Sequence, residues 1–192
     1  MSTENVTIII KNGETKVRQH GRWNGIPTAM LTAICDTLNK HLDALDKNVL
    51  RCKLVDENKV ERLNEANETF KKIKEYGRQT GPKRRWDFES MKEWVDYLSE
   101  AFDRKDVQTY ILQSDDTGYS IAEVIATCDF EGDLILPDCD CDSTCAGIDL
   151  VCTIDLDNQA LIADWLGTIC EWDFDELPTY DELERLEDEE ES

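Results

Sequence analysis

The sequence predicts an α+β fold, in which a mostly antiparallel sheet is built from N-terminal and C-terminal hairpins and helices pack against it. Two β-rich stretches carry this prediction, one at residues 6–20 and the other at residues 148–165. Between them, apolar residues recur every three or four positions, which is the spacing of a helix packed on one side. We therefore expect residues 1–186 to form a single domain, basic and helix-rich over 1–85 and acidic and β-rich over 86–186.

The first predicted element is a hairpin of two strands, Val6–Lys11 and Glu14–His20. The Asn12-Gly13 pair lies between them, and this pair is favoured where both residues of a turn need positive φ. A turn over 21–27 then leads to a helix that Thr28 caps. The apolar stripe of this helix consists of Met30, Leu31, Ile34, Cys35, Leu38, Leu42 and Leu45.

Two further helices are predicted in the middle of the chain. Residues 56–76 are strongly polar with a thin apolar stripe, which indicates an exposed helix, and residues 77–85 break it with a Gly-Pro pair. Residues 87–102 show a clear amphipathic pattern. Residues 107–113 have the composition of a strand, and Ser120 begins a capping box that predicts a short helix over 121–128.

The C-terminal part is predicted to contain several strands and a final helix. A short apolar run, 134–136, ends at Pro137, and two β-rich runs, Ile148–Leu156 and Gln159–Trp165, meet at Asp157-Asn158 in a tight hairpin. Residues 169–174 add another strand. Thr179 and Glu182 then form a second capping box before a final helical turn, and residues 187–192 are expected to be a frayed acidic tail.

Charge is unevenly distributed along the 192 residues, whose formal net charge is −22. Residues 1–85 contain 17 Lys or Arg and 11 Asp or Glu, which gives +6, whereas residues 86–192 contain 4 and 32, which gives −28. A block of like charge repels itself, so either a cationic partner or a solvated surface without a partner explains it. This balance argues against direct binding of nucleic acid over the general surface, because such binding needs many cations.

Several functional classes are disfavoured by what the sequence lacks. No apolar run is long enough to span a bilayer, and the N-terminus does not have the pattern of a signal segment, so we expect a cytoplasmic protein with reduced thiols and no membrane contact. Phosphate-binding glycine patterns and nucleophile motifs are absent, and the chain has only two His. We therefore expect a protein that is not an enzyme and has no cofactor.

An Asp- and Cys-rich segment over 137–152 is the densest group of potential ligands. Its thiols, Cys139, Cys141, Cys145 and Cys152, could bind zinc, but their spacing lacks the paired Cys-x2-Cys units of zinc sites. Its carboxylates could instead form a calcium loop, with Asp138, Asp140, Asp142 and Asp149 at the first, third, fifth and twelfth positions. An acidic solvent-exposed loop is the preferred interpretation, and a metal-binding protein centred on 138–152 remains an alternative.

A basic patch over 71–86 stands out against the acidic background. It ends in Lys83, Arg84, Arg85 and Trp86. Such a patch can bind RNA, so an RNA-binding inhibitor is a second alternative. It can equally pair with the acidic half of the chain or with a second copy in a homo-oligomer, and this interpretation is preferred.

Three segments resemble a family of small, mostly uncharacterised phage and prophage proteins. They are Thr15–Pro27 (TKVRQHGRWNGIP), Cys152–Asn158 (CTIDLDN) and Trp172–Pro178 (WDFDELP). The family has a strand ending in Gly-x-Trp-Asp-Gly-Tyr-Pro and a later Tyr-x-Ile-Asp-Leu-Asp strand; Asn24 and Ile26 stand here where the family has Asp and Tyr. The resemblance implies a viral or prophage setting and a compact α+β core, and it assigns no catalytic residues.

In that setting, a strongly acidic small protein is similar to the DNA mimics with which phages inhibit nucleases, including anti-CRISPR and anti-restriction proteins. Carboxylates arranged like phosphates can occupy a cationic nucleic-acid channel. The main hypothesis is therefore a phage-encoded inhibitor that binds a host protein with a cationic groove. The acids assigned to this contact are Asp138, Asp140, Asp142, Asp149, Asp173, Asp175 and Glu176.

Overall fold

The structure is a computed structural model, and it describes residues 3–23, 27–56, 109–111, 121–128, 132–139 and 147–190. Its helical elements are α1 (Pro27–Asn48), η1 (Val49–Arg51), α6 (Ile121–Ala126), η3 (Phe174–Glu176) and α7 (Tyr180–Glu190). Its strands are β1 (Thr3–Lys11), β2 (Glu14–Trp23), β3 (Cys52–Asp56), β4 (Thr109–Ile111), β5 (Asp133–Asp138), β6 (Leu150–Asp155), β7 (Ala160–Trp165) and β8 (Thr168–Asp173). The helix predicted over 56–76 lies outside the described residues except for Asp56, which is the last residue of β3. The helix predicted over 87–102 lies wholly outside them.

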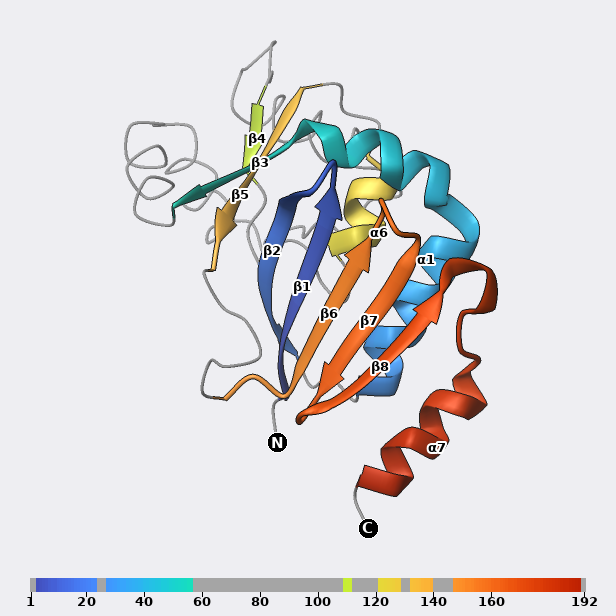
Figure 1. Ribbon diagram of the computed structural model, residues 1–192. Helices are drawn as coiled ribbons and strands as arrows, with labels where there is room; N and C mark the ends of the chain where they lie inside the picture. The colour runs from blue at the N-terminus through green and yellow to red at the C-terminus, as the bar shows by residue number, and fades with distance from the viewer. Residues whose placement is uncertain are drawn as a thin grey trace, which may run out of the picture.

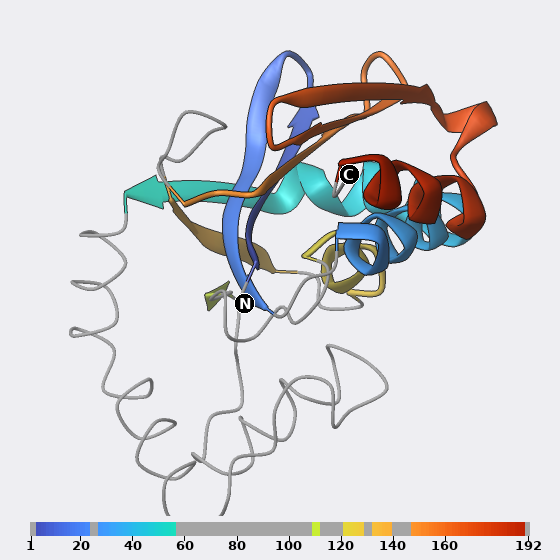
Figure 2. The same cartoon turned by 90° about the horizontal axis from the view of Figure 1, so that it is seen from below.

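A five-stranded sheet with the order β2-β1-β6-β7-β8 organises the fold. Every neighbouring pair is antiparallel except β1 and β6, which run parallel and join the N-terminal hairpin to the C-terminal strands. Helices α1 and α6 lie on one face of this sheet (Figure 1), and the view from below shows α7 on the same side (Figure 2). The predicted α+β fold with a mostly antiparallel sheet is therefore confirmed.

The N-terminal hairpin forms where the sequence predicts it. Asn12 and Gly13 have φ values of 57° and 69°, and two successive positive values are what a type I′ turn requires. The register shifts at a bulge between Ile9 and Ile10. The turn predicted over 21–27 is wrong for residues 21–23, because β2 continues to Trp23 and stays paired with Thr3. Residues 24–26 of that turn lie outside the described residues.

Helix α1 packs against the sheet with the predicted apolar stripe, but its start differs from the prediction. The helix begins at Pro27, whose fixed φ suits a first helical position, so Thr28 lies inside the helix and is not its cap. The buried Thr28 hydroxyl instead donates a hydrogen bond to the Glu187 carboxylate on α7. The helix bends at His41, whose φ and ψ of −137° and 19° are not helical.

A second sheet of three parallel strands, in the order β3-β5-β4, was not predicted as such. Strand β4 confirms part of the strand expected over 107–113. Strand β5 contains the apolar run 134–136 and continues through Pro137. Among the described residues, the pairing of β4 with β5 ends at Ile135, and Pro137 is paired there only with Val55 of β3. A proline is tolerated where one side of a strand needs no backbone donor.

The C-terminal elements follow the prediction with two corrections. Strands β6 and β7 form the expected hairpin, but their loop has four residues, 156–159, and Gln159 has a positive φ of 56°. Strand β8 is present, and α6 confirms the predicted short helix for residues 121–126. Ser120 of its predicted capping box lies outside the described residues. The expected tail at 187–192 is wrong for residues 187–190, which form the last turn of α7.

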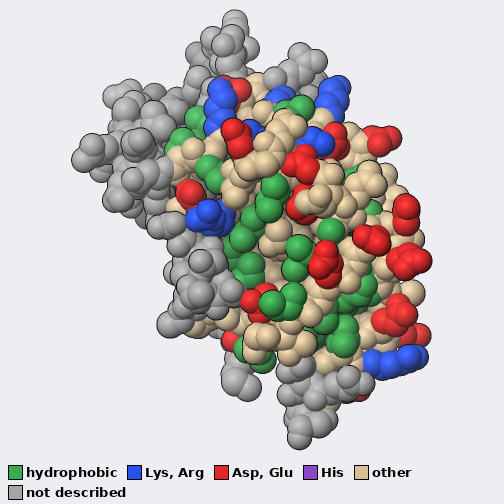
Figure 3. Space-filling model, viewed as in Figure 1, with side chains coloured by type: hydrophobic (Ala, Val, Ile, Leu, Met, Phe, Trp, Pro, Cys, Tyr) green, Lys and Arg blue, Asp and Glu red, His purple; other side chains and the backbone are tan. Residues whose placement is uncertain are grey.

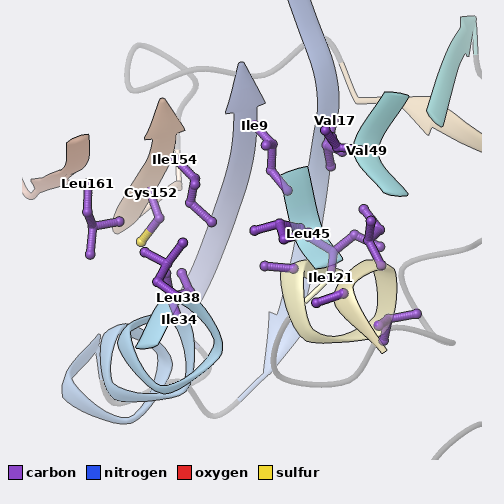
Figure 4. Close-up of a cluster of buried hydrophobic side chains, with 14 of the residues drawn as sticks. Ile9, Val17, Ile34, Leu38, Leu45, Val49, Ile121, Cys152, Ile154 and Leu161 are labelled. Carbon is purple, nitrogen blue, oxygen red and sulfur yellow. The ribbon is translucent and has the colours of Figure 1, made fainter. Parts of the chain in front are cut away.

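The core lies between the five-stranded sheet and α1. Ile154 and Leu161 point from neighbouring strands toward Ile34 and Leu38 of the helix, and Ile9 points toward Leu45 (Figure 4). All six are at most 3% exposed. Burying such a side chain stabilises the folded state by about 1.5–3 kcal/mol, so this layer supplies much of the stability. Leu134 and Leu136 of the second sheet belong to the same cluster, which joins the two sheets.

One carboxylate connects the two hairpins at their tips. Asp157, in the β6–β7 loop, accepts hydrogen bonds from the N–H groups of Asn12 (2.9 Å) and Gly13 (2.7 Å). Lys11 lies 3.9 Å from the same carboxylate. The two N–H groups, with a smaller contribution from Lys11, lower the pKa of Asp157 below its usual value.

This contact predicts a specific loss of stability in acid. Because the folded state has the lower pKa, Asp157 stabilises the protein above the pKa of the unfolded chain, and this contribution is lost as pH falls through the folded pKa. We expect Asp157→Ala to lower the melting temperature at neutral pH and to reduce the acid-induced decrease that the parent protein shows below about pH 4. Asp43→Ala, which removes an exposed carboxylate on α1, is the control. Parallel pH profiles for Asp157→Ala and the parent protein would contradict this assignment.

Candidate functional site: an acidic C-terminal surface

Acidic side chains are concentrated in the last described segment of the chain. Residues 147–190 contain fifteen Asp or Glu and a single cationic residue, Arg185. Six exposed acids from three consecutive elements form what we call the C-terminal acidic surface: Glu171, Asp173, Asp175, Glu176, Asp181 and Glu184. Red side chains gather on the right-hand side of Figure 3, where β8 lies in the same view.

The strand and the 3₁₀ helix place the first four acids by simple geometry. Successive side chains of a strand point to opposite faces, so Glu171 and Asp173 share the outer face of β8. Trp172, between them, turns inward and is half-buried against the core. The chain then turns into η3, where Asp175 and Glu176 are exposed.

A capping box fixes the start of α7, as the sequence predicts. The Thr179 N–H and hydroxyl each donate to the Glu182 carboxylate at 2.8 Å, and the Glu182 N–H donates to the Thr179 carbonyl oxygen at 3.2 Å. The donors on Thr179 lower the pKa of Glu182. Leu183 is fully buried and docks the helix on α1, so Asp181 and Glu184 are held on its exposed side.

The charge of this surface is little compensated within the described part of the chain. The ion pairs found there involve acids of other elements, such as Asp46 with Lys11 (2.5 Å) and Asp133 with Lys53 (2.5 Å). None of them includes a member of the C-terminal acidic surface. Carboxylates crowded in this way produce a negative potential that extends about 10 Å at 0.1 M salt.

The structure separates the acids that the sequence assigned to one contact. Asp173, Asp175 and Glu176 lie together on the C-terminal acidic surface. Asp138 lies at the end of β5, where its carboxylate is 3.6 Å from the Arg18 guanidinium. These four residues therefore do not form one patch, because β2 and β8 are opposite edges of the sheet.

Asp149 has a structural role at the start of β6. Its carboxylate accepts a hydrogen bond from the Glu4 N–H (3.1 Å), and its own N–H donates to the Glu4 carbonyl oxygen (2.9 Å). It lies at the opposite end of the strands from Asp173, since the Leu150–Trp165–Thr168 row is the far end of β6, β7 and β8. Asp140 and Asp142 lie outside the described residues.

Two thiols of the Asp- and Cys-rich segment, Cys139 and Cys152, are described, and they lie apart. Cys152 is fully buried on the inner face of β6, and this burial raises the pKa of its thiol well above the usual value. Cys139 follows β5 and donates its N–H to the Arg18 carbonyl oxygen of β2 (3.4 Å), two strands away from β6. Cys141 and Cys145 lie outside the described residues. Across the ranges that the structure describes, no group of three potential metal ligands is found.

Two other thiols are also poorly suited to chemistry at neutral pH. Burial raises the pKa of Cys35 to about 11 and that of Cys52 to about 12. Both thiols therefore stay protonated, and the protonated form is a weak nucleophile. His20 pairs with Glu4 across the hairpin, with Nε2 3.1 Å from the carboxylate. The basic residues Lys83, Arg84 and Arg85 and the adjacent Trp86 lie outside the described residues.

Comparison with known proteins adds no relationship, because no protein family, curated protein or solved structure matches the chain. A search of the described helices for a membrane span is also negative, since none combines the necessary length and apolar character.

Three members of the C-terminal acidic surface were not among the acids predicted from the sequence: Glu171, Asp181 and Glu184. The signal for Glu171 was available, because the alternation in Ile-Cys-Glu-Trp-Asp places it on the same face as Asp173. The α7 acids could be placed only once the helix was known to extend to Glu190 and to dock through Leu183.

Proposed function

We propose that this protein is an acidic inhibitor of the DNA-mimic type, which occupies the cationic groove of a host defence or nucleic-acid-processing enzyme. The observation that supports the proposal is the C-terminal acidic surface, whose six exposed carboxylates come from β8, η3 and α7. The phage or prophage setting is an inference from the resemblance of Thr15–Pro27, Cys152–Asn158 and Trp172–Pro178 to phage proteins.

The physical basis of the proposal is electrostatic complementarity. A groove that binds nucleic acid is lined with Lys and Arg, which neutralise phosphates. Carboxylates held on a strand, a 3₁₀ helix and a docked α-helix present fixed negative charges to such a groove without the cost of ordering a flexible chain. Complementary charge mainly accelerates association and makes binding sensitive to salt.

The test is inhibition of DNA cleavage by purified nucleases. The probes are one restriction endonuclease and one CRISPR effector nuclease, each assayed on its DNA substrate with increasing amounts of the protein. We expect inhibition at low salt that weakens as salt is raised. We expect the double variant Asp175→Lys, Glu176→Lys to lose at least about tenfold in inhibitory potency, because several charge contacts are reversed.

A matched variant distinguishes inhibition through the C-terminal acidic surface from a general effect of net charge. Asp36→Lys with Asp43→Lys changes the net charge by the same amount at two exposed positions of α1. We expect this variant to inhibit nearly as well as the parent protein. Equal loss in both double variants, or no inhibition of either nuclease class by the parent protein, would contradict the proposed function.

A further inference from the structure

Strand β8 is the edge of the five-stranded sheet that the described residues leave open. It pairs with β7 on one side, and no described strand pairs with its other side. Helix α7 appears beyond β8 in Figure 1, but Figure 2 shows it on the side of the sheet where α1 lies. The opposite edge, β2, is covered by the end of β5, where Asp138 and Cys139 contact Arg18. An open edge presents backbone donors and acceptors to a further strand.

The hydrogen bonds between β7 and β8 determine which backbone groups face outward. The Phe174 N–H donates to the Gln159 carbonyl oxygen at 2.8 Å, just beyond the last paired residues of the two strands. Hydrogen-bonded and non-bonded pairs alternate along an antiparallel ladder, so every second residue back from Phe174 bonds to β7. The N–H groups of the intervening residues point away from the sheet. These residues are Ile169, Glu171 and Asp173.

The side chains of the same three residues form a pattern along this edge. All three share the outer face, because they alternate with the inward-facing Cys170 and Trp172. Ile169 is 69% exposed, and Leu166 in the adjoining turn is 65% exposed, so one end of the edge is apolar. Glu171 and Asp173 are exposed at the other end and make it acidic.

We propose that β8 is a docking edge for an extended basic segment of another protein, which adds to the sheet as a sixth strand. Backbone groups of such a strand would bond to the outward N–H groups, and its side chains would lie opposite those of β8. The pattern on β8 then defines the partner: Lys or Arg at two alternate positions, opposite Asp173 and Glu171, and an apolar side chain two positions away, opposite Ile169.

Charge also decides between this partner and a second copy of the chain. When the segments Ile169–Asp173 of two β8 strands overlap fully in antiparallel register, Glu171 lies opposite its own copy and Asp173 lies opposite Ile169. Like charges directly opposite each other destabilise a strand pair. The acids that oppose self-pairing therefore favour a basic strand. This inference needs only β8 and does not depend on the proposed inhibition of a nuclease.

Binding of designed peptides tests the strand addition. The probes are the synthetic peptide Thr-Lys-Thr-Lys-Thr-Ile-Thr, for antiparallel pairing, and its reversed sequence, for parallel pairing. We expect one of them to bind and to slow amide hydrogen exchange at Ile169, Glu171 and Asp173, with little change at Trp172, which already bonds to β7.

N-methylation of the peptide backbone distinguishes pairing as a strand from a loose contact between charges. Every measurement in this experiment uses the parent protein. In the antiparallel peptide, N-methylation of the Lys and Ile residues removes the N–H groups that face β8, and we expect binding to weaken about tenfold or more. N-methylation of the internal Thr residues removes N–H groups on the far side and should leave binding within about twofold. For the reversed peptide, the two methylation patterns exchange roles, because parallel hydrogen bonds engage the intervening residues.

Charge variants complete the test. Glu171→Lys should weaken peptide binding about tenfold or more, whereas Glu184→Lys, the same change on α7, should leave it within about twofold. The proposal is overturned if neither peptide binds, if both methylation patterns act alike, or if both charge variants act alike. Sedimentation that shows a β8-dependent dimer would also overturn it, because the occupant would then be a second copy.

Discussion

Replacing Asn48 with Asp should lower the free energy of unfolding by about 3–5 kcal/mol at pH 7, because it places an unpaired charge against carbonyl oxygens in the interior. Asn48 is 9% exposed at the end of α1. Its Nδ2 donates to the carbonyl oxygens of Ile125 (2.9 Å), Ala126 (3.4 Å) and Cys128 (3.0 Å). The final carbonyl groups of a helix lack partners within the helix, so this side chain satisfies the end of α6.

A neutral substitution separates the charge from the lost hydrogen bonds. Asn48→Leu has a similar size and removes the Nδ2 donor from the same carbonyl oxygens, of which that of Ile125 keeps the Cys128 N–H as a donor; the loss should cost about 1–3 kcal/mol. Chemical denaturation of the three proteins at pH 7 should therefore give the order parent, Asn48→Leu, Asn48→Asp. Values for both variants within about 0.5 kcal/mol of the parent would show that Asn48 does not hold α6 in this way.

The pH dependence of Asn48→Asp has a definite sign. Burial among carbonyl oxygens raises the folded pKa of the introduced carboxyl group above its unfolded value near 4. The protonated form is neutral and can still donate one hydrogen bond. The destabilisation should therefore be smallest at low pH and should grow as pH rises through the folded pKa. Asn48→Leu should show no such added pH dependence.

The parts of the fold that could be predicted are those fixed by neighbouring residues. Asn12-Gly13 determines a turn by its own backbone preference, and Thr179 with Glu182 begins a helix through a contact three residues apart. In both cases the structure follows the sequence because the decisive interaction is local. The same holds for the alternation in β6 and β7, where Ile154 and Leu161 belong to the core and their neighbours Thr153 and Ile162 are only partly buried.

The parts that could not be predicted depend on contacts between distant residues. The parallel pairing of β1 with β6 joins residues that are 145 apart, as in the Glu4 and Asp149 contact, and no local pattern specifies that partner. Strands β3 and β5 are short and are identified by their pairing with each other. Their sequences, such as Lys-Leu-Val, are compatible with several local structures.

The candidate site also combines features set by local sequence with features set by contacts between distant residues. The sequence shows that the second half of the chain is acidic, but charge counting cannot say which acids share a surface. Arg18 holds Asp138 at the other edge of the sheet, whereas the docking of Leu183 on α1 leaves Asp181 and Glu184 exposed on α7. Distant packing therefore decides which carboxylates are structural and which belong to the C-terminal acidic surface.

Replacing Leu161 with Ala should lower the free energy of unfolding by about 3 kcal/mol, within the 2–5 kcal/mol typical of a large buried aliphatic side chain. Leu161 is fully buried on the inner face of β7, opposite Ile154 on β6 and facing α1 (Figure 4). Removing its side chain leaves a cavity in the layer that joins the sheet to the helix, and close-packed surroundings collapse only partly into such a cavity.

The next residue along the strand is the matched control. Ile162 faces the other side of β7 and is only half-buried, so Ile162→Ala should cost about 1 kcal/mol or less. Urea denaturation of both variants measures the difference directly. A slip of one residue in the register of β7 would exchange the two faces of the strand. A larger loss for Ile162→Ala than for Leu161→Ala would therefore show that the opposite face of β7 carries the core, and would remove the basis for the outward orientation of Glu171 and Asp173 on β8.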